Sequence, residues 1–303
     1  MKVAAGIDIG GTKTAIGLVN ENGVLIGKKV IPTDLSLPPY EMIDRMAEEL
    51  KLLLQQCSIT EDGCAGIGIG APGPLNSKEG SVTSPPNLPS WKGIQVTKQL
   101  EKHFSIPISL ENDASAATLA EKWVGAAQDA NDFIYMTIST GIGAGIFANG
   151  QLITGKSGNA GDIGHMVIDP AYGAREGELE GGFEYIASGT GIARHASKLT
   201  GETLTAADVF ERARQGDAQL QAFVDTIFEK IGVGCVSLIN TLDPEKIVIG
   251  GGVTRVGAPL FDAVQAFVNE RALGPSGRET TIVPSGLDQD AGVIGAAAIV
   301  FLN

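Results

Sequence analysis

Asp113 is the side chain whose position in the sequence best suits it to chemistry. Residues 106–110 alternate apolar and polar side chains, several of them β-branched, which predicts a strand. The alanine-rich residues 114–121 that follow are good helix formers. Because open α/β sheets bind ligands where their strands end, Asp113 could act there as a general base. Asn112 and Asp113 could equally cap the helix, and the local sequence leaves both interpretations open.

A glycine-rich turn near the N-terminus could bind phosphate. Residues 3–9 and 14–19 are expected to form a hairpin around Gly10-Gly11-Thr12-Lys13. The glycines let backbone N–H groups approach a phosphate, Thr12 adds a hydroxyl donor, and Asp8 could hold Mg²⁺ through water. The turn lacks the Walker spacing, and no helix follows it as a dinucleotide-binding fingerprint requires. An ordinary hairpin turn is the alternative.

Two further glycine turns follow in the second half of the chain. Residues 133–138 and 145–148 flank Ser139-Thr140-Gly141-Ile142-Gly143-Ala144, which is again a strand, a glycine turn and a strand. Two such units in one chain indicate a duplicated fold that closes on a nucleotide. The third turn, Gly250-Gly251-Gly252, follows an expected strand at 246–249 and would let a flat ring lie against backbone.

Several polar side chains lie in rigid or glycine-rich loops. Asn87 lies between prolines that would hold its amide in place, although a plain loop is the alternative. The segment Gly158-Asn159-Ala160-Gly161-Asp162-Ile163-Gly164-His165 gathers polar groups among glycines. A single histidine is often structural, but Asp162 three residues earlier keeps a functional role for His165 open. Glu184 follows a charged, glycine-rich loop at 171–182, which is expected to be solvated.

Apolar periodicity predicts the elements that must position these groups. Helices are expected at 40–55, 96–103, 114–121, 207–214, 218–240 and 290–301, and further strands at 24–30, 65–69, 151–154 and 282–284. No low-complexity linker interrupts the chain, so the domain boundary is expected to be a hinge. We expect a small α/β domain of residues 1–113, completed by a C-terminal helix at 290–303, and a larger α/β domain of residues 114–289.

Composition limits the class of protein. The 303 residues suffice for about two domains of ~100–200 residues each. Glycine, at 41 residues, is roughly twice as frequent as the usual ~7%, which suits many tight turns. The formal charge of −13 argues against a nucleic-acid partner and implies that Mg²⁺ or backbone N–H groups would hold any phosphate.

Cysteine usage and hydropathy indicate the compartment. Cys57, Cys64 and Cys235 are few and scattered, so no disulfide framework is implied and a reducing compartment is expected. The first residues lack the apolar core of a signal peptide. Residues 133–155 are uncharged but contain five glycines and several polar residues, so strands and turns are expected there instead of a membrane span. We therefore expect a cytoplasmic protein with no membrane partner.

These motifs together resemble the ROK family of sugar kinases and sugar-sensing repressors, and the resemblance covers essentially the whole chain. Residues 8–13 look like the first phosphate motif of that family, residues 139–143 like the second, and residues 250–253 like its adenosine motif. Glu111-Asn112-Asp113 is similar to the sugar and base segment. The resemblance implies a two-domain actin-like, ribonuclease H-like ATPase fold with an active-site cleft between the domains, and a homodimer.

The resemblance also implies an activity and a set of site residues. The chain would be an ATP-dependent kinase that transfers the γ-phosphate to a sugar hydroxyl, usually the 6-OH of a hexose, with Mg²⁺ as the metal. Asp113 would accept the hydroxyl proton. The implied sugar contacts are Asn87, Asn112, Asp162, His165 and Glu184. The implied nucleotide contacts are Asp8, Gly10, Gly11, Thr12, Lys13, Thr140, Gly141, Gly143, Gly250, Gly251 and Gly252, with Asp8 also holding Mg²⁺ through water.

Two departures from the family pattern stand out. Asp162-Ile163-Gly164-His165 replaces Glu-x-Gly-His, which shortens one carboxylate side chain. The zinc loop Cys-x-Cys-Gly-x-x-Gly-Cys-x-Glu aligns without a gap with residues 175–184, where Arg175, Gly177 and Gly182 replace its three cysteines. We therefore expect no structural zinc, with the loop ordered instead by the packing of Leu179 and Phe183.

The same family includes other acceptors and other activities. Glucose is the default acceptor, and amino or N-acetylated hexoses, mannose, fructose and β-glucosides are alternatives. A sugar-responsive repressor would need a DNA-binding module before the first phosphate motif, where only seven residues precede Asp8. A non-catalytic sugar-sensing regulator would be expected to have lost Asp113 or a phosphate turn, and neither is lost.

Overall fold

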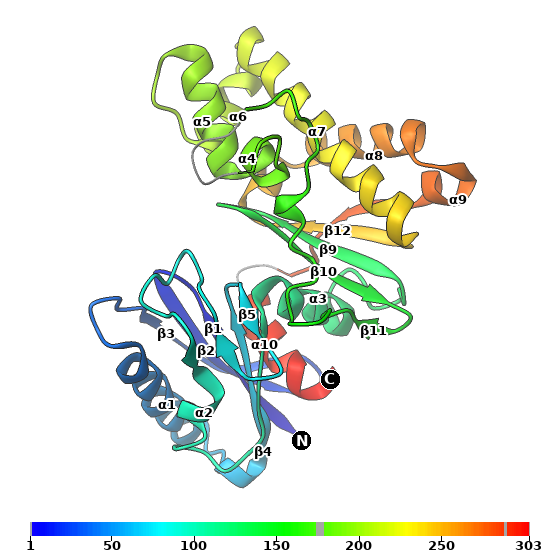
Figure 1. The fold of residues 1–303 in the computed structure, drawn as a ribbon. Helices are drawn as coiled ribbons and strands as arrows, with labels where there is room; N and C mark the ends of the chain where they lie inside the picture. Colours follow the sequence, from blue (N-terminus) through cyan, green and yellow to red (C-terminus); the bar gives the residue numbers. More distant parts are fainter. Residues whose placement is uncertain (1, 174–178, 288–289, 303) are drawn as a thin grey trace. The chain divides into compact units, whose positions relative to one another are not determined.

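The computed structural model describes residues 2–173, 179–287 and 290–302, and the chain divides into two compact units (Figure 1). The first unit consists of Met1–Asp129, Leu152–Ala160 and Gly286–Asn303, and the second of Ala130–Gln151 and Gly161–Ser285. This division differs from the expected boundary after residue 113. The chain stays in the first unit through α3 (Asp113–Val124) because α3 packs against α10 (Ala291–Leu302).

The sheet of the first unit combines an antiparallel hairpin with parallel strands. Its order is β3-β2-β1-β4-β8, in which β1 runs antiparallel to β2 and parallel to β4, and β4 runs parallel to β8. The carboxyl ends of β1, β4 and β8 therefore lie at the same edge of the sheet. The strands are β1 (Val3–Ile9), β2 (Lys13–Asn20), β3 (Leu25–Pro32), β4 (Cys64–Ala71) and β8 (Ile108–Asn112).

Helices cover both faces of this sheet. The alternation of β1 directs Ile7 and Ile9 into a core with α1 (Pro39–Gln56), and directs Ala4 into a core with α10. Helix α10 lies directly on strand backbone, since a Cβ at Gly68 would be 1.8 Å from the Ala296 carbonyl oxygen. Smaller elements complete the unit: η1 (Glu61–Gly63), β5 (Leu75–Asn76), β6 (Ser81–Val82), β7 (Ile94–Gln95) and α2 (Val96–Leu100).

The sheet of the second unit repeats the same pattern of strand directions. Its order is β11-β10-β9-β12-β13, with β9 antiparallel to β10 and parallel to β12, and β12 parallel to β13. This recurrence confirms the duplicated α/β fold predicted from the glycine turns. The strands are β9 (Phe133–Ile138), β10 (Ile142–Ala148), β11 (Gln151–Leu152), β12 (Lys246–Gly250) and β13 (Thr281–Pro284).

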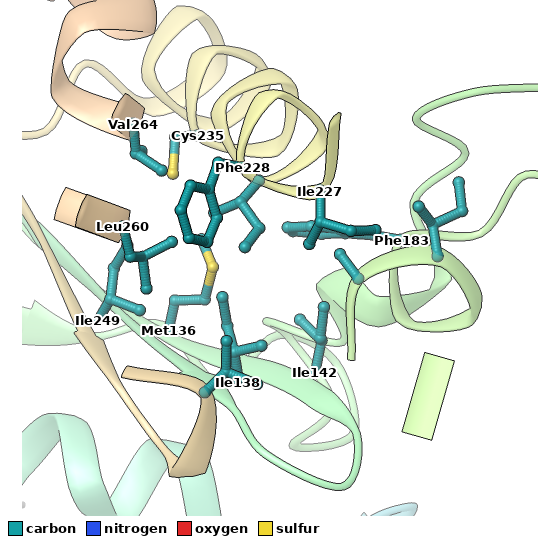
Figure 2. Close-up of a cluster of buried hydrophobic side chains, with 14 of the residues drawn as sticks. Met136, Ile138, Ile142, Phe183, Ile227, Phe228, Cys235, Ile249, Leu260 and Val264 are labelled. Carbon is teal, nitrogen blue, oxygen red and sulfur yellow. The ribbon is translucent and has the colours of Figure 1, made fainter. Parts of the chain in front are cut away.

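A cluster of buried apolar side chains joins the helices of this unit to its sheet. Figure 2 shows Phe228 and Cys235 of α7 (Ala218–Leu242) above Met136 of β9, beside Leu260 of α8 (Ala258–Arg271). The remaining elements are η2 (Ile163–His165), α4 (Phe183–Ala187), α5 (Gly189–Thr200), α6 (Ala206–Arg214), η3 (Gly252–Val256) and α9 (Gly274–Glu279).

The loop before α4 differs in part from its prediction. Phe183 is fully buried in the core of the second unit, as expected, whereas Leu179 is 42% exposed and does not order the loop by burial. Backbone contacts of Gly182 hold the end of the loop: its N–H donates to the Leu179 carbonyl at 3.0 Å, and Gly182 pairs with Val167 in an isolated β-bridge. The aligned positions 175–178 lie outside the described residues. None of the described helices is long and apolar enough to cross a membrane.

Candidate active site

The first glycine turn is held open by one threonine. The Thr33 hydroxyl donates to the Gly10 carbonyl at 2.8 Å, and the Thr33 N–H donates to the Thr12 carbonyl at 3.0 Å. These bonds use carbonyl groups and leave donors free: among the described residues, nothing accepts a hydrogen bond from the N–H of Gly11 or Thr12. Two unpaired N–H groups on a rigid turn are suited to binding a phosphate oxygen.

Asp8 lies half-buried immediately before this turn, at the end of β1. Burial raises its pKa to about 6, and the negative charge of Asp113 adds to the rise, while Lys13 and Lys28 oppose it. The pKa of Asp8 is raised because its ionised form is disfavoured, and a cation beside the two carboxylates would stabilise that ionised form. Hard oxygen donors fit Mg²⁺, so the residues present suit the metal that the family implies.

Asn112, and not Asp113, is the N-cap of α3. The Asn112 Oδ1 accepts from the N–H groups of Ala114 at 2.9 Å and Ser115 at 3.4 Å. Asp113 is the first helical residue, and its Oδ1 accepts from the Ala114 N–H at 2.8 Å. The Asn112 Nδ2 has no hydrogen-bond partner among the described residues, so it is available to a ligand. The capping interpretation therefore applies to Asn112 and leaves the Asp113 carboxylate for chemistry.

The environment of Asp113 favours its protonated form. The side chain is open to solvent, yet the protein atoms gathered around it raise its pKa above the usual value for aspartate, and its bond from the Ala114 N–H partly opposes this. A general base is most effective when its pKa is close to the working pH. The direction of the shift thus suits the role predicted for Asp113.

Gly70 separates the two carboxylates. The register of the sheet pairs Asp8 with Gly70, and Gly70 with Glu111. A Cβ at residue 70 would be 3.9 Å from the Asp113 Cα and 3.9 Å from the Asp8 Oδ1. The first unit therefore brings Asp8 and Asp113 together across a position with no side chain.

Asn87 lies against the first glycine turn. A Cβ at Gly11 would be 3.0 Å from the Asn87 carbonyl oxygen and 3.1 Å from the Asn87 Cβ. The side chain is exposed, so its amide is open to a ligand. Within the first unit, Asn87, the glycine turn, Asp8, Asn112 and Asp113 thus occupy the same edge of the sheet.

The second glycine turn binds Glu184. The Glu184 Oε2 accepts from the Ile142 N–H at 2.7 Å, and a Cβ at Gly141 would be only 2.3 Å from that oxygen. The N–H groups of Thr140 and Gly141 have no acceptor among the described residues. The turn therefore keeps phosphate donors available while it fixes one oxygen of a predicted sugar ligand.

Asp162 and His165 form a pair at the surface of the second unit. The Asp162 Oδ1 lies 3.0 Å from the His165 Nδ1, and both side chains are exposed. A carboxylate oxygen accepts hydrogen bonds, so His165 carries a hydrogen on Nδ1 and presents Nε2 outward. The 3₁₀ turn η2 that bears His165 packs on Glu184, because a Cβ at Gly164 would be 3.1 Å from the Glu184 Cβ.

The third glycine turn borders a cavity of about 790 Å³ within the second unit. Gly251, with a φ of 92°, lies on β9, since a Cβ there would be 2.4 Å from the Ile138 carbonyl oxygen. The residues that line the cavity include Ser139, Thr140 and Gly252 of the glycine turns, and also the apolar side chains of Phe210, Val224 and Phe228. Phosphates at the glycine turns and a flat base among apolar side chains would suit such a cavity.

Sequence reasoning gave no role to several of these residues. Gly70 carries no local signal, because its position between two carboxylates depends on strand register. Phe210, Val224 and Phe228 belong to amphipathic helices, whose periodicity cannot distinguish a core face from a cavity wall. Glu111 was noted only within its motif. Its side chain is 7% exposed, its Oε2 has no hydrogen-bond partner in the described part of the chain, and burial raises its pKa to about 7.

The described residues show no side-chain cluster of the kind that binds a metal ion. Among these, no group of three or more His, Cys, Asp or Glu side chains is arranged to hold a metal ion. Arg175 and Gly177, which replace two of the family's zinc-binding cysteines, fall outside the described residues, and Gly182 carries no ligand.

Comparison with known proteins identifies the family. The ROK family model matches residues 4–302. The chain belongs to the ROK family. It is 33% identical to the glucokinase of Thermotoga maritima, over 97% of this chain and 96% of that protein. It is also 33% identical to a β-glucoside kinase of Listeria monocytogenes, over 98% of this chain and 96% of that protein.

A solved structure of the family shares the fold. The ROK family glucokinase of Streptomyces griseus, crystallised in complex with glucose and AMPPNP, superposes with a TM-score of 0.80 and 27% identity, covering 98% of each chain. This similarity confirms the actin-like α/β fold expected from the motifs.

Proposed function

We propose that this protein is an ATP-dependent hexose kinase that transfers the γ-phosphate of ATP to the 6-hydroxyl of glucose or a related hexose. The observation that carries the proposal is the pair of carboxylates beside the first glycine turn, with the pKa of Asp113 raised and its side chain open to solvent. The complex of the Streptomyces griseus relative with glucose and an ATP analogue supports both substrates.

Asp113 would make the sugar a competent nucleophile. A sugar hydroxyl attacks phosphorus poorly, so Asp113 takes its proton as the oxygen bonds to the γ-phosphorus and the bond to the ADP oxygen breaks. Such general-base catalysis contributes roughly 10²–10⁴ in rate. The Asn112 Nδ2, the outward Nε2 of His165 and the exposed amide of Asn87 would orient the ring. The second oxygen of Glu184 would accept a hydrogen bond from a sugar hydroxyl.

The glycine turns would hold the nucleotide. N–H groups of Gly11, Thr12, Thr140 and Gly141 would donate to phosphate oxygens, and the apolar side chains that line the cavity would take the base. Lys13, Gly10, Gly143 and the Gly250–Gly252 turn would shape this path. Mg²⁺, held by Asp8 through water, would neutralise charge on the phosphates when bound. With a net charge of −13, the protein would depend on these donors more than on basic side chains.

The identity of the sugar decides between closely related activities. Glucose is the acceptor named for the Thermotoga maritima relative, and the Listeria monocytogenes relative at equal identity makes a β-glucoside the second candidate. Amino, N-acetylated and keto hexoses are further alternatives. The three cysteines are all free, in accord with a cytoplasmic enzyme, and the family makes a homodimer the expected assembly.

A single assay tests the proposal. Purified protein is mixed with ATP, Mg²⁺ and a panel of hexoses, hexosamines and β-glucosides while ADP release is followed. Sugar-dependent ADP formation with the highest kcat/KM for glucose is expected. If a β-glucoside gives the highest kcat/KM, the proposed acceptor changes from glucose to a β-glucoside, and the proposed mechanism stays the same. Tight sugar binding without ADP release would instead identify a sugar-sensing regulator.

A further inference from the structure

Asn159 makes two hydrogen bonds to the backbone of Leu75, a residue 84 positions earlier in the chain. The Asn159 Oδ1 accepts from the Leu75 N–H at 3.1 Å, and the Asn159 Nδ2 donates to the Leu75 carbonyl at 3.0 Å. One side-chain amide thus satisfies both backbone groups, as a neighbouring strand would. Both residues belong to the first unit, where residues 152–160 form a separate excursion of the chain.

Close backbone contact supports this anchor. Gly158, with a φ of 88°, packs on the turn that follows β5, because a Cβ there would be 2.6 Å from the Ser77 Oγ. Gly158 is buried and Asn159 half-buried, so the excursion lies against the loop and strand that contain Leu75. The side chain of Asn159 is therefore a fixed part of the first unit and not a loose surface group.

The loop that Asn159 anchors also packs against the side chain of Asn112. A Cβ at Gly73 would be 3.2 Å from the Asn112 Nδ2 and 3.7 Å from the Asn159 Oδ1, so Gly73 lies between the two amides. The Asn112 Oδ1 is already committed to the N-terminus of α3. The direction of its Nδ2 thus depends on the cap on one side and on the loop at Gly73 on the other.

We propose that Asn159 is a positioning residue for the sugar. By fixing Leu75, and with it the loop at Gly73, Asn159 holds the free N–H₂ group of Asn112 in the place where it meets a sugar hydroxyl. The inference rests on the proposed function, which makes Asn112 a sugar ligand. The first glycine turn is held separately by Thr33, so loss of Asn159 should weaken the sugar and spare the nucleotide.

Two substitutions test this role. Asn159→Ala removes both bonds to Leu75, and Asn159→Asp keeps the acceptor but sets a carboxylate oxygen against the Leu75 carbonyl. Each should raise the KM for the preferred sugar about three- to tenfold, as expected for the loss of one or two neutral hydrogen bonds. The KM for ATP should stay within about twofold of wild type, since no nucleotide contact is altered.

Ser157→Ala is the matched control. The Ser157 Oγ is the other acceptor of the Asn159 Nδ2, at 3.1 Å, and lies in the same excursion. Its removal leaves both bonds to Leu75 in place, so both KM values should stay within about twofold of wild type. An unchanged sugar KM in folded Asn159 variants, or a parallel rise in the KM for ATP, would overturn the inference.

A further variant tests the proposal if the Asn159 variants fail to fold. Gly73→Ala places a methyl group against the Asn112 Nδ2 while it leaves the Asn159 bonds intact, and the backbone of Gly73 is accessible to alanine because its φ is not positive. It should give the same sugar-selective rise in KM, and an unchanged value would contradict the proposal. If the wild-type protein releases no ADP with any sugar, the proposed function fails. Sugar affinity by titration calorimetry then decides the inference, with a three- to tenfold loss (roughly one hydrogen bond) expected for Asn159→Ala.

Discussion

At the residue scale, the first unit places two like charges on either side of a glycine. Asp8 and Asp113 come from different elements and both lie close to Gly70, which has no side chain. Each carboxylate is harder to ionise because protein atoms surround it, and the charge of Asp113 adds to the effect at Asp8. Such a pair divides two tasks, since one carboxylate can attract a cation while the other accepts a proton.

Asp113→Asn should lower kcat by at least ~10², the low end of the general-base range. Stability should barely change, because Asn112 supplies the cap of α3 and asparagine is tolerated in the first turn. Measurement of kcat at saturating sugar and ATP, together with the melting temperature, tests this. A variant that melts early but turns over normally per folded molecule would assign Asp113 a structural role only.

Asp162→Glu should change the KM for the preferred sugar by several-fold and leave the KM for ATP nearly unchanged. The shorter aspartate carboxylate now bonds to the His165 Nδ1 at 3.0 Å, and an added methylene would displace it from that position. Both the orientation of His165 and the reach of the carboxylate would then change. Steady-state kinetics with each substrate varied in turn test this, and equal effects on both KM values would argue that Asp162 shapes only its loop.

Glu111→Gln should make stability less dependent on pH. Burial raises the pKa of Glu111 from its ordinary 4.5 to about 7, so the folded chain holds this proton more tightly than the unfolded chain. The stability from this group is present below about pH 4.5 and is lost as pH rises through about 7. The difference between the two pKa values corresponds to about 3 kcal/mol.

Urea unfolding at pH 5 and pH 8.5 measures this effect. The wild type should lose more stability between the two pH values than Glu111→Gln, and the exposed Glu48→Gln should behave as wild type does. Identical pH dependence in wild type and Glu111→Gln would show that the buried Glu111 carboxylate has a partner when folded.

At the element scale, α3 carries Asp113 at its start and, near its end, a residue that binds the backbone where the chain leaves and re-enters the first unit. It begins at the Asn112 cap, and near its end the Glu121 carboxylate is fully buried. The Glu121 Oε2 accepts from the Ala126 N–H at 2.6 Å and from the Gly286 N–H at 3.2 Å. Ala126 lies just before the chain leaves the first unit, and Gly286 is where it re-enters. A single carboxylate therefore secures both crossings to the helix that bears Asp113.

Glu121→Ala should lower the free energy of unfolding by about 2 kcal/mol or more. It removes the two hydrogen bonds that the Ala126 and Gly286 N–H groups donate to a buried carboxylate, each at roughly 1–3 kcal/mol. Glu48→Ala, at an exposed position of α1, should change it by less than about 0.5 kcal/mol. Denaturant unfolding of both variants tests this, and equal stabilities would mean that water or another group replaces the Glu121 oxygen.

At the scale of the whole molecule, the duplicated sheets supply N–H donors that an acidic protein needs in order to bind phosphate. Each unit presents a glycine turn between the first two strands of a five-stranded sheet, with N–H groups that nothing accepts among the described residues. A chain with a formal charge of −13 repels phosphates at long range. In the proposed function, oriented N–H groups and a divalent cation would overcome this repulsion at short range.

The purified protein should contain far less than one zinc per chain. Structural zinc is tetrahedral and prefers thiolate or imidazole ligands, typically four. Gly182 offers no ligand, His165 is bonded to Asp162, and Cys64 and Cys235 are buried elsewhere. Metal analysis after dialysis measures zinc content. Stoichiometric zinc, with activity lost to a zinc chelator in excess Mg²⁺, would contradict this prediction and would place ligands in the loop at 175–178.

The sequence alone predicted the features that depend on local physics. Helical periodicity over 40–55 and 218–240 located α1 and α7 to within two residues, since an apolar face repeats every turn. Glycine turns between alternating runs located both hairpins, because strand side chains alternate between two faces and glycine permits a tight turn. Helix α5 was not predicted because it begins with Gly189 and Gly191, which disfavour a helix, and the Ser188 cap and tertiary packing stabilise it.

Long-range contacts decided the rest of the candidate site. The register of three strands placed Gly70 between Asp8 and Asp113, the packing of α3 on α10 moved the unit boundary from residue 113 to Asp129, and two hydrogen bonds joined Asn159 to Leu75. None of these has a local signal, because each joins residues that are distant in sequence and meet only when the chain is folded. Residue type and spacing determined which groups could react, and tertiary packing determined which of them meet, which are buried and how readily each takes up a proton.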